Sequence, residues 1–560
     1  MQKNNLLLLS AASMMLLSTS CSSKLGALSA DNFKVVPDPL EAHSGQVPAT
    51  INGMFPEKYM KKKAVVTVTP ELRYADGMVA RGASATFQGE KVEGNDQTIS
   101  YLVGGNYTMK TSFKYVPEMQ KSDMYLTFNA RVGKKEVEVP AVKVATGVIA
   151  TSELCKTTVR TAESSIAPDA FQRVTQQKQE ANIKFLIQQA TLRKSELKNN
   201  SVTEFVRLLK DINDNQEGLI LNNVEVSAYA SPDGGFKLNE KLADKRRQTS
   251  EKYVQQQLKS AKLDAPVDGG YTAQDWEGFQ ELVKASDIQD KDVILRVLSM
   301  YKDPEEREQQ IKNISQAFRE LADGILPQLR RARLTINYEV VGRDDEQIMA
   351  QLSKDAKQLS VEEMLYAATL SENPAEQEAI YKKTTEIYPN DCRAYNNIAA
   401  MEMAKGNNVE AKRYIAKATA INANSAEANI NLGLMALQEG DLNAAEGYIA
   451  KGTGASGYAE ALGNLHLAQG NYAQAERDFG KVSSNSAALA QILNKNYAAA
   501  ATTLNNVKNA DAMTSYLKAV LNARQGNNTE AAAALRTAVA KDASLARYAA
   551  ADLELRNISK

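Results

Sequence analysis

Three different spacings of apolar residues follow one another along the chain. From 32 to 148 apolar and polar positions alternate, as in the run Val66-Thr67-Val68-Thr69, and this is the period of a strand with one buried face. From 181 to 343 short apolar runs alternate with stretches in which apolar residues recur every three or four positions, as in an amphipathic helix. From 344 to 560 the helical spacing continues alone. The sequence therefore predicts a multidomain chain with a β-rich part, an α+β part and an all-α part.

The amino-terminal alternation predicts an antiparallel β-sandwich over 32–148. Its strand-like runs end at Gly104-Gly105 and at Gly133, which supply the positive φ that tight hairpins need. Alternating burial then packs one face of each sheet against the other. The Cys-Trp-Cys signature of true immunoglobulin domains is missing. The sequence leaves two roles open for this domain, a passive spacer and a docking module.

The middle part predicts an α+β layer domain, with helices on one face of a small sheet. A capping box at Ser201-Val202-Thr203-Glu204 opens one helix, and a longer helix follows the turn at 231–235. The polar stretch 149–180 is interpreted as a connector with a helical leaning. Strands are expected at 183–187, 224–229 and 334–341.

A specific motif lies at the turn and on the helix after it. The run Ala228-Tyr229-Ala230-Ser231-Pro232-Asp233-Gly234 is followed by Asn239, Leu242, Ala243 and Arg246. This arrangement resembles the OmpA-like domain of cell-envelope proteins, in an expanded variant with an Ala-Ser-Pro-Asp-Gly turn and an insertion that carries Trp276. The resemblance implies a site in which an Asp of the turn and the helix Arg hold the two charged ends of a diaminopimelate side chain of peptidoglycan. We interpret Trp276 as a core residue, with a ligand platform as the alternative.

The candidate peptidoglycan-binding residues are Ser231, Asp233, Asn239 and Arg246. An Arg fork suits a carboxylate, but by residue count the family's Asp falls on Ser231, and Asp233 lies two positions later. The alternative is that Asp233 only stabilises a Pro-Asp-Gly turn and that Arg246 pairs with a local carboxylate. Retained and lost peptidoglycan binding both stay open.

The carboxy-terminal part repeats itself. Leu432-Gly433 precedes Gly440, Leu462-Gly463 precedes Gly470, and 34 residues separate Gly406 from Gly440. A helix–turn–helix period of this length resembles tetratricopeptide repeats, in which Gly ends the first helix and small residues let the helices approach closely. About five repeats are expected, stacked into an all-α solenoid whose concave face suits peptides or helices. A rigid spacer is the alternative to a protein-binding role.

The first residues predict export. Lys3 precedes an apolar stretch from Leu6 to Leu17, and small residues then lead to Cys21, as in a secretory signal peptide. The stretch is shorter than the ~20 residues that span a bilayer. The residues before Cys21 resemble the bacterial lipoprotein box, which implies cleavage before Cys21 and its lipidation, and Ser22-Ser23 then favours the outer membrane. An ordinary signal peptide with a chance Cys is the alternative.

Composition narrows the function classes. Lys+Arg and Asp+Glu both number 67, which argues against nucleic acid as the main partner. Three Cys exclude a disulfide framework, and Cys155 and Cys392 are expected as separate thiols, with a bridge between them as the alternative. His43 and His466 have no Cys partners at metal spacing. Phosphate-loop and common hydrolase motifs are missing, so we expect no metal, no cofactor and no enzymatic activity.

Together these features predict a scaffold lipoprotein of the outer membrane that faces the periplasm. The lipid would hold the membrane, the repeats would recruit envelope proteins, and peptidoglycan is a second candidate partner. The alternative is an assembly or structural component of a surface appendage or outer-membrane complex without peptidoglycan binding. The expected segments are a signal peptide (1–20), a lipidated tether (21–31), the β-sandwich (32–148), the connector (149–180), the OmpA-like domain (181–343) and the repeats (344–560).

Overall fold

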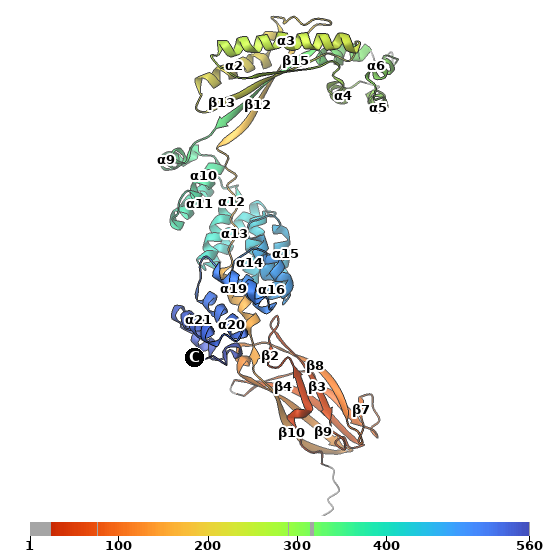
Figure 1. The fold of residues 1–560 in the computed structure, drawn as a ribbon, viewed down its shortest axis with the longest axis vertical. Coiled ribbons are helices and arrows are strands. Elements are labelled where there is room, and N and C mark those ends of the chain that lie inside the picture. Colours follow the sequence, from red (N-terminus) through yellow and green to blue (C-terminus); the bar gives the residue numbers. More distant parts are fainter. Residues whose placement is uncertain (1–23, 76, 289–290, 314–318, 559–560) are drawn as a thin grey trace, which may run out of the picture. The chain divides into compact units, whose positions relative to one another are not determined.

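The computed structural model describes residues 24–558 except 76, 289–290 and 314–318 (Figure 1). The predicted signal peptide and Cys21 lie outside the described residues. The chain forms two compact units. The first consists of Met1–Pro168 and Asn373–Lys560, and the second of Asp169–Glu372.

The first unit opens with a domain of two sheets around one core, which we call the β-domain. One sheet has the order β1-β3-β8, the other has the order β10-β9-β4-β6-β7 with β5 beside β4, and β2 pairs with β11. Burial alternates along β3 and β8, so one face of each strand lies in the shared core. The expected β-rich amino-terminal part is confirmed. The strands are β1 (Phe33–Val36), β2 (Leu40–Glu41), β3 (Gln46–Phe55), β4 (Ala64–Tyr74), β5 (Met78–Arg81), β6 (Ala85–Gly89), β7 (Gln97–Ile99), β8 (Gly105–Lys114), β9 (Ser122–Val132), β10 (Lys135–Thr146) and β11 (Val148–Ile149).

The expected tether is partly folded onto the β-domain. Leu25 and Leu28 are buried in its core, and the 3₁₀ turn η1 (Ala30–Asn32) is capped by Ser29. The part of the tether that the structure describes therefore packs on the domain and does not extend from it.

The carboxy-terminal helices form antiparallel pairs, as the repeat spacing predicted. Gly406, Gly440, Gly470 and Gly526 all have positive φ at the turns between paired helices, and Lys495 takes this conformation in the shortened copy. The paired helices are α12 (Cys392–Ala404) with α13 (Asn408–Ile421), α14 (Ala426–Glu439) with α15 (Leu442–Ile449), α16 (Tyr458–Ala468) with α17 (Tyr472–Phe479), α18 (Asn485–Leu493) with α19 (Tyr497–Asn505), and α20 (Ala512–Arg524) with α21 (Asn528–Lys541). Helix α11 (Pro374–Ile387) precedes them, and α22 (Ser544–Ala549) and η9 (Leu553–Leu555) follow.

Close helix packing explains the small residues of the repeats. A Cβ on Gly433 would lie 2.5 Å from Cγ1 of Ile449, and one on Gly463 would lie 2.6 Å from the ring of Phe479. Glycine at the centre of the first helix thus admits a large side chain from the second. This position costs helix propensity but removes a steric clash.

Residues 149–168 lead from the β-domain into the repeats. They form η3 (Thr151–Leu154), α1 (Cys155–Thr158) and η4 (Val159–Thr161), and from 162 they run without helix or strand. The helical leaning expected for 149–180 is thus right for 151–161 only. The strand β12 already begins at Val174, because its exposed face is polar and its apolar pattern shows only near its end.

The second unit is a mixed sheet with the strand order β12-β15-β13-β14. Helices α2 and α3 pack against it, with Phe205 and Val254 in a shared core. Strands were expected at 183–187, 224–229 and 334–341, and the first of these is wrong, since β12 ends at Lys184. The elements are β12 (Val174–Lys184), α2 (Asn200–Asp214), β13 (Leu219–Tyr229), α3 (Phe236–Ser260), β14 (Val267–Thr272), α4 (Trp276–Ala285), α5 (Lys291–Met300), α6 (Pro304–Asn313), η6 (Leu321–Ile325), α8 (Leu326–Leu329), β15 (Arg331–Val341), α9 (Asp345–Asp355) and α10 (Val361–Thr369).

The insertion between β14 and β15 has a small core of its own. Trp276 packs against it, edge-on to Phe279 at 5.6 Å between ring centroids, and its Nε1 donates to Gln274. This position agrees with the interpretation of Trp276 as a core residue. Within the described part of the chain, no helix combines the length and apolar character needed to cross a membrane.

Candidate functional site

The repeats hold the connector by its backbone. The Asn431 side chain accepts from the Ser165 N–H (2.7 Å) and donates to the Ser165 carbonyl (2.8 Å). The Asn397 side chain makes the same pair of bonds with Ala167, at 2.7 and 3.1 Å. Two asparagines thus each bind both polar backbone groups of one residue. We call the face that makes these contacts, on helices α12, α14, α16 and α18, the connector-binding face.

The two asparagines occupy the same place in consecutive repeats. Each lies nine positions before the turn glycine, Gly406 or Gly440, and they are 34 residues apart. Their targets are two residues apart, which matches the period of an extended chain. In the copy that turns at Lys495 the equivalent residue is Ser486, whose hydroxyl bonds that of Thr158 at 2.8 Å. One position of the repeat therefore contacts the connector three times.

This contact is buried and its polar groups are paired. Asn396, Asn397 and Asn431 are at most 1% exposed, and Ser165 is fully buried. Asn396 donates to the Ser165 carbonyl (3.0 Å) and accepts from Asn431 (2.9 Å), so the three amides form one network. Unpaired amides at this depth would each cost about 1–3 kcal/mol. Because the network reads backbone atoms, it holds an extended polypeptide without selecting its side chains.

Further along the connector, Glu460 faces the Glu163 N–H at 3.4 Å. Burial raises the pKa of the Glu460 carboxyl, and hydrogen bonds from Ser484 and Glu163 oppose this shift. A second polar contact joins the Ser165 and Ser456 hydroxyls at 3.1 Å. The connector is therefore bound along most of its extended part.

The β-domain also touches the repeats directly. The Ser44 hydroxyl donates to the Ala468 carbonyl (2.7 Å), and the Tyr472 hydroxyl lies 3.0 Å from Nδ1 of His43. Burial raises the pKa of Tyr472 to about 12. These contacts, together with the connector, join the β-domain and the repeats into one compact unit.

Neither histidine nor the cysteines form a reactive site among the described residues. His466 pairs with Asp478 on the neighbouring helix, and no group of three His, Cys, Asp or Glu is placed to hold a metal within the described part of the chain. Cys155 and Cys392 are both free thiols, as expected, and burial raises the pKa of Cys155 to about 12. A thiol that stays protonated is a poor nucleophile.

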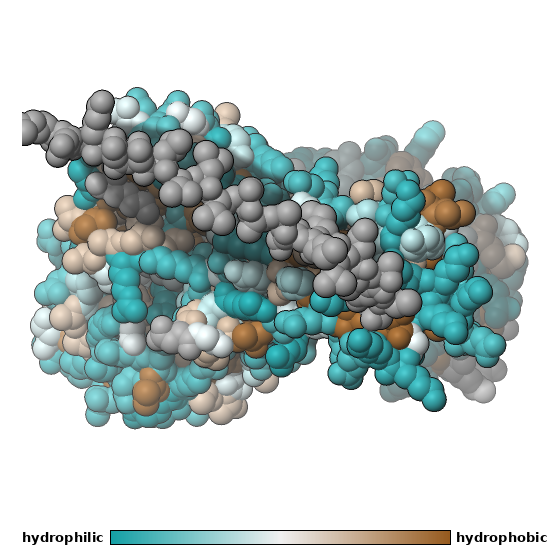
Figure 2. Space-filling view, turned by 90° about the horizontal axis from the view of Figure 1, so that it is seen from below, coloured by the Kyte–Doolittle hydropathy of each residue, from teal (hydrophilic) through white to brown (hydrophobic). Residues whose placement is uncertain are grey.

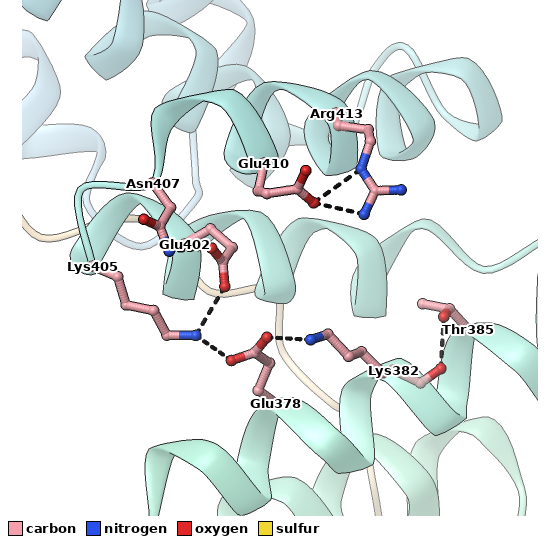
Figure 3. Close-up of polar contacts among 8 residues, drawn as sticks. All are labelled: Glu378, Lys382, Thr385, Glu402, Lys405, Asn407, Glu410 and Arg413. Atoms are coloured by element: carbon pink, nitrogen blue, oxygen red, sulfur yellow. Dashed lines mark hydrogen bonds and ion pairs between the residues drawn. The ribbon is translucent and has the colours of Figure 1, made fainter.

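The charged residues of α11 to α13 form a ladder of ion pairs (Figure 3). Lys405 bridges Glu378 on α11 and Glu402 on its own helix, and Lys382 also contacts Glu378 at 2.5 Å. Burial by itself would raise the pKa of Glu378, but the two lysines lower it overall. The lysines are half exposed, and pairs of this kind add little stability. We interpret the ladder as a link between neighbouring helices.

The four residues predicted to bind peptidoglycan lie together at the turn after β13. Asn239 donates to the carbonyls of Ser231 and Gly234, both at 2.9 Å, and so closes the turn. The Ser231 hydroxyl donates to Asp233. Asp233 also pairs with Arg330, at 3.1 Å. Sequence reasoning missed Arg330, which comes from the far side of the insertion, 97 residues later.

Arg246 lies in the interior of the second unit. Its side chain is fully buried and donates to the backbone carbonyls of Gln189 (3.0 Å), Tyr229 (2.8 Å) and Leu186 (3.2 Å). Burial, followed by the nearby Arg330, lowers its pKa to about 10. The alternative that Arg246 pairs with a local carboxylate is wrong, because its acceptors are carbonyls. In this arrangement its fork is fully used inside the fold.

The comparisons with known proteins give only distant likenesses. No family model and no curated protein matches the chain. Among solved structures, a tetratricopeptide repeat protein from Parabacteroides merdae is 17% identical, with 38% of this chain and 91% of that one covered and a TM-score of 0.28. The Cut9–Hcn1 hetero-tetramer of the APC/C is 14% identical, with 58% and 77% covered and a TM-score of 0.29. YrrB, a TPR protein with an unusual peptide-binding site, is 15% identical, with 37% and 98% covered and a TM-score of 0.19.

At these TM-scores the likenesses carry no conclusion about function. The description of the carboxy-terminal part rests on its own geometry, which is a series of helix pairs with a glycine turn and a 34-residue spacing.

Proposed function

We propose that the protein is a non-catalytic scaffold of the cell envelope that recruits other proteins through its repeats. The observation that carries this proposal is the contact of Asn397 and Asn431 with the connector. It supports a repeat array that binds polypeptide, and it makes the repeats and the β-domain a single body. A body of this kind can present several surfaces in a fixed arrangement.

The membrane anchor in this proposal is a lipid on Cys21, in the outer membrane and on its periplasmic side. The support is the apolar stretch Leu6–Leu17 followed by small residues and Cys21. Acyl chains contribute about 0.8 kcal/mol per buried methylene, and stable anchoring needs more than one chain. The scaffold would then act where its partners are also membrane-bound.

The second unit gives two candidate roles. Contact with peptidoglycan is the first, and it would use the turn of Ser231 and Asp233. The second is assembly of an appendage or outer-membrane complex without peptidoglycan contact. The burial of Arg246 and the pairing of Asp233 with Arg330 favour the second role, because both charged groups are already satisfied.

Two measurements test the proposal. The full chain and its Cys21→Ala variant are expressed with labelled palmitate; label and outer-membrane fractionation should be lost only in the variant. Chemical cross-linking on intact cells should then capture envelope proteins with the full chain. A chain that carries no lipid and cross-links to no envelope protein would overturn the proposal.

A sedimentation assay with purified sacculi separates the two roles of the second unit. The soluble chain from Ser22 to Lys560 is compared with Asp233→Asn and Ser231→Asp. Binding by the parent that falls in Asp233→Asn supports contact with peptidoglycan. Absence of binding by the parent, with or without a gain in Ser231→Asp, supports the assembly role.

A further inference from the structure

One end of the β-domain receives the chain from the predicted anchor. Strand register defines this end, because Phe33 pairs with Gly53, Phe55 with Gly105, and Ala64 with Val132. The entry of the chain and the loops 56–63 and 100–104 therefore lie at the same end. We call this the tether end, and it lies at the lower end of the β-domain in Figure 1.

The tether end is held close to Cys21. Leu25 is 5% exposed in the domain core, and the Gly26 carbonyl accepts from the Tyr59 hydroxyl at 3.1 Å. Four residues separate Cys21 from Leu25, and four residues span at most ~14 Å when fully extended. A lipid on Cys21 would therefore keep this end within reach of the headgroup layer, whatever the conformation between them.

The loop 100–104 carries the two most exposed apolar side chains of the β-domain. Leu102 is 65% exposed and Val103 is 80% exposed. The turn that presents them is ordered, since Gly104 N–H donates to the Ser100 carbonyl and Lys58 N–H donates to the Tyr101 carbonyl at 2.6 Å. An ordered turn that holds two aliphatic side chains in water suits insertion into a membrane interface.

Lysines surround these apolar residues. The loop 56–63 contains Lys58, Lys61, Lys62 and Lys63 but only one acidic residue, Glu57, which lies 4.0 Å from Lys58. The Lys61 ammonium lies 5.4 Å from the centroid of the Tyr101 ring. The nearest other carboxylate in the loops, Glu90, already accepts from the Ser100 hydroxyl at 2.9 Å. The loop is therefore basic beside the apolar turn.

Seen from below, the molecule shows mostly hydrophilic residues, with hydrophobic ones in small separate groups (Figure 2). A small apolar turn flanked by lysines fits a layer of anionic headgroups better than it fits a broad apolar protein surface.

We infer that the tether end is a membrane-docking surface for an anionic phospholipid bilayer. Leu102 and Val103 enter the headgroup layer, and Lys58 and Lys61–Lys63 contact lipid phosphates. This inference rests on the proposed lipid anchor at Cys21. The lipid keeps the protein at the membrane, and the docking surface fixes the orientation of the β-domain on it.

Vesicle sedimentation tests this inference on the soluble chain from Ser22 to Lys560, which contains every described residue and lacks the lipid. The probes are vesicles of phosphatidylethanolamine with phosphatidylglycerol, and vesicles of phosphatidylcholine alone. The parent should bind the anionic vesicles and not the zwitterionic ones, and added salt should weaken the binding.

Three variants locate the surface. The double variant Leu102→Ser/Val103→Ser should lose more than about tenfold in affinity. The triple variant Lys61→Gln/Lys62→Gln/Lys63→Gln should lose about fivefold per lysine and much of its salt dependence. Val409→Ser is the matched control, because Val409 is 81% exposed on the repeats, and its affinity should equal that of the parent. Thermal melts check that all three remain folded.

A parent that ignores anionic vesicles overturns the inference, and so do turn or lysine variants that bind as the parent does. If the parent ignores vesicles and the turn variant instead loses a cross-linked envelope protein, the surface belongs to a protein partner. Palmitate labelling reports on Cys21 separately, so failure of the anchor and failure of the docking surface are distinguished.

Discussion

Replacement of Asn431 by alanine should release the connector from the repeats. The variant loses the bonds of the Asn431 side chain to the Ser165 N–H and carbonyl and to Asn396. The Ser165 carbonyl keeps a donor from Asn396. The Ser165 N–H keeps none of the partners described above, and its residue is fully buried. The main loss is therefore one stranded donor, with a second amide left short of a partner.

The size of the effect follows from these bonds. A buried donor that loses its acceptor costs about 1–3 kcal/mol, and an ordinary hydrogen bond contributes about 1 kcal/mol. The expected loss is roughly 3 kcal/mol, which is on the order of 100-fold in the equilibrium between held and released connector. The repeats themselves keep their helix pairs, so the release should be local.

Amide hydrogen exchange read by mass spectrometry measures this release. Peptides that cover 160–168 should exchange up to about 100-fold faster in Asn431→Ala, at both Ser165 and Ala167. Asn429→Ala is the matched control. Asn429 is also a buried asparagine on α14, but it donates to the carbonyls of Ala423 and Ser425 within its own repeat. Equal exchange of the connector in the parent and in Asn431→Ala, or an equal rise in Asn429→Ala, would refute the reasoning.

Three further predictions concern stability in urea. Gly433→Ala should lower the unfolding free energy by about 1–3 kcal/mol, because its Cβ would clash with Ile449, whereas Gly447→Ala on the facing helix has open space and should raise it by about 0.5–1 kcal/mol; equal effects would contradict this packing. Arg246→Lys should destabilise the second unit by roughly 2–4 kcal/mol, because one ammonium cannot serve three carbonyls in the fork's geometry; lost sacculus binding at unchanged stability would instead mark Arg246 as a ligand. Burial raises the folded-state pKa of Glu460, so stability should fall as pH rises from the ordinary pKa of a glutamate through that raised value, and Glu460→Gln should flatten this slope; a parallel pH profile would contradict the burial effect.

The repeats were predictable because their physical causes are local. Gly406 and Gly440 adopt positive φ, which few other residues tolerate, and Gly433 fills a position where a Cβ would clash. Such requirements recur at fixed spacing and are visible in the sequence. The alternation along β3 and β8 is visible for the same reason, since one face of each strand is buried.

The start of β12 was not predictable from its pattern. Only Ala181 and Ile183 of this strand are buried, because it lies at the edge of the sheet. Its other residues are polar or exposed, so the apolar signal marked only its last positions. The pairing of Asp233 with Arg330 was equally hidden, since it spans the whole insertion.

The connector-binding asparagines were missed although a signal existed. A buried amide on a helix breaks the apolar pattern and looks like an irregularity when it is considered alone. Asn397 and Asn431 become meaningful when they are aligned on their turn glycines, because the same exception then appears at the same place 34 residues apart. A polar residue that repeats with the period must meet a polar partner, and here the partner is the backbone of an extended segment.

The tethering of this segment bears on where partners bind. The connector is covalently part of the chain, and a short tether gives an effective concentration on the order of millimolar. A free peptide with the same backbone contacts would have to exceed that concentration to replace it. The amides of Asn397 and Asn431 are therefore committed to Ala167 and Ser165, and partners of ordinary affinity are expected on residues that the repeats leave exposed. The Asn431→Ala variant separates the two cases, because release of the connector should strengthen a partner that competes for the connector-binding face and leave any other partner unchanged.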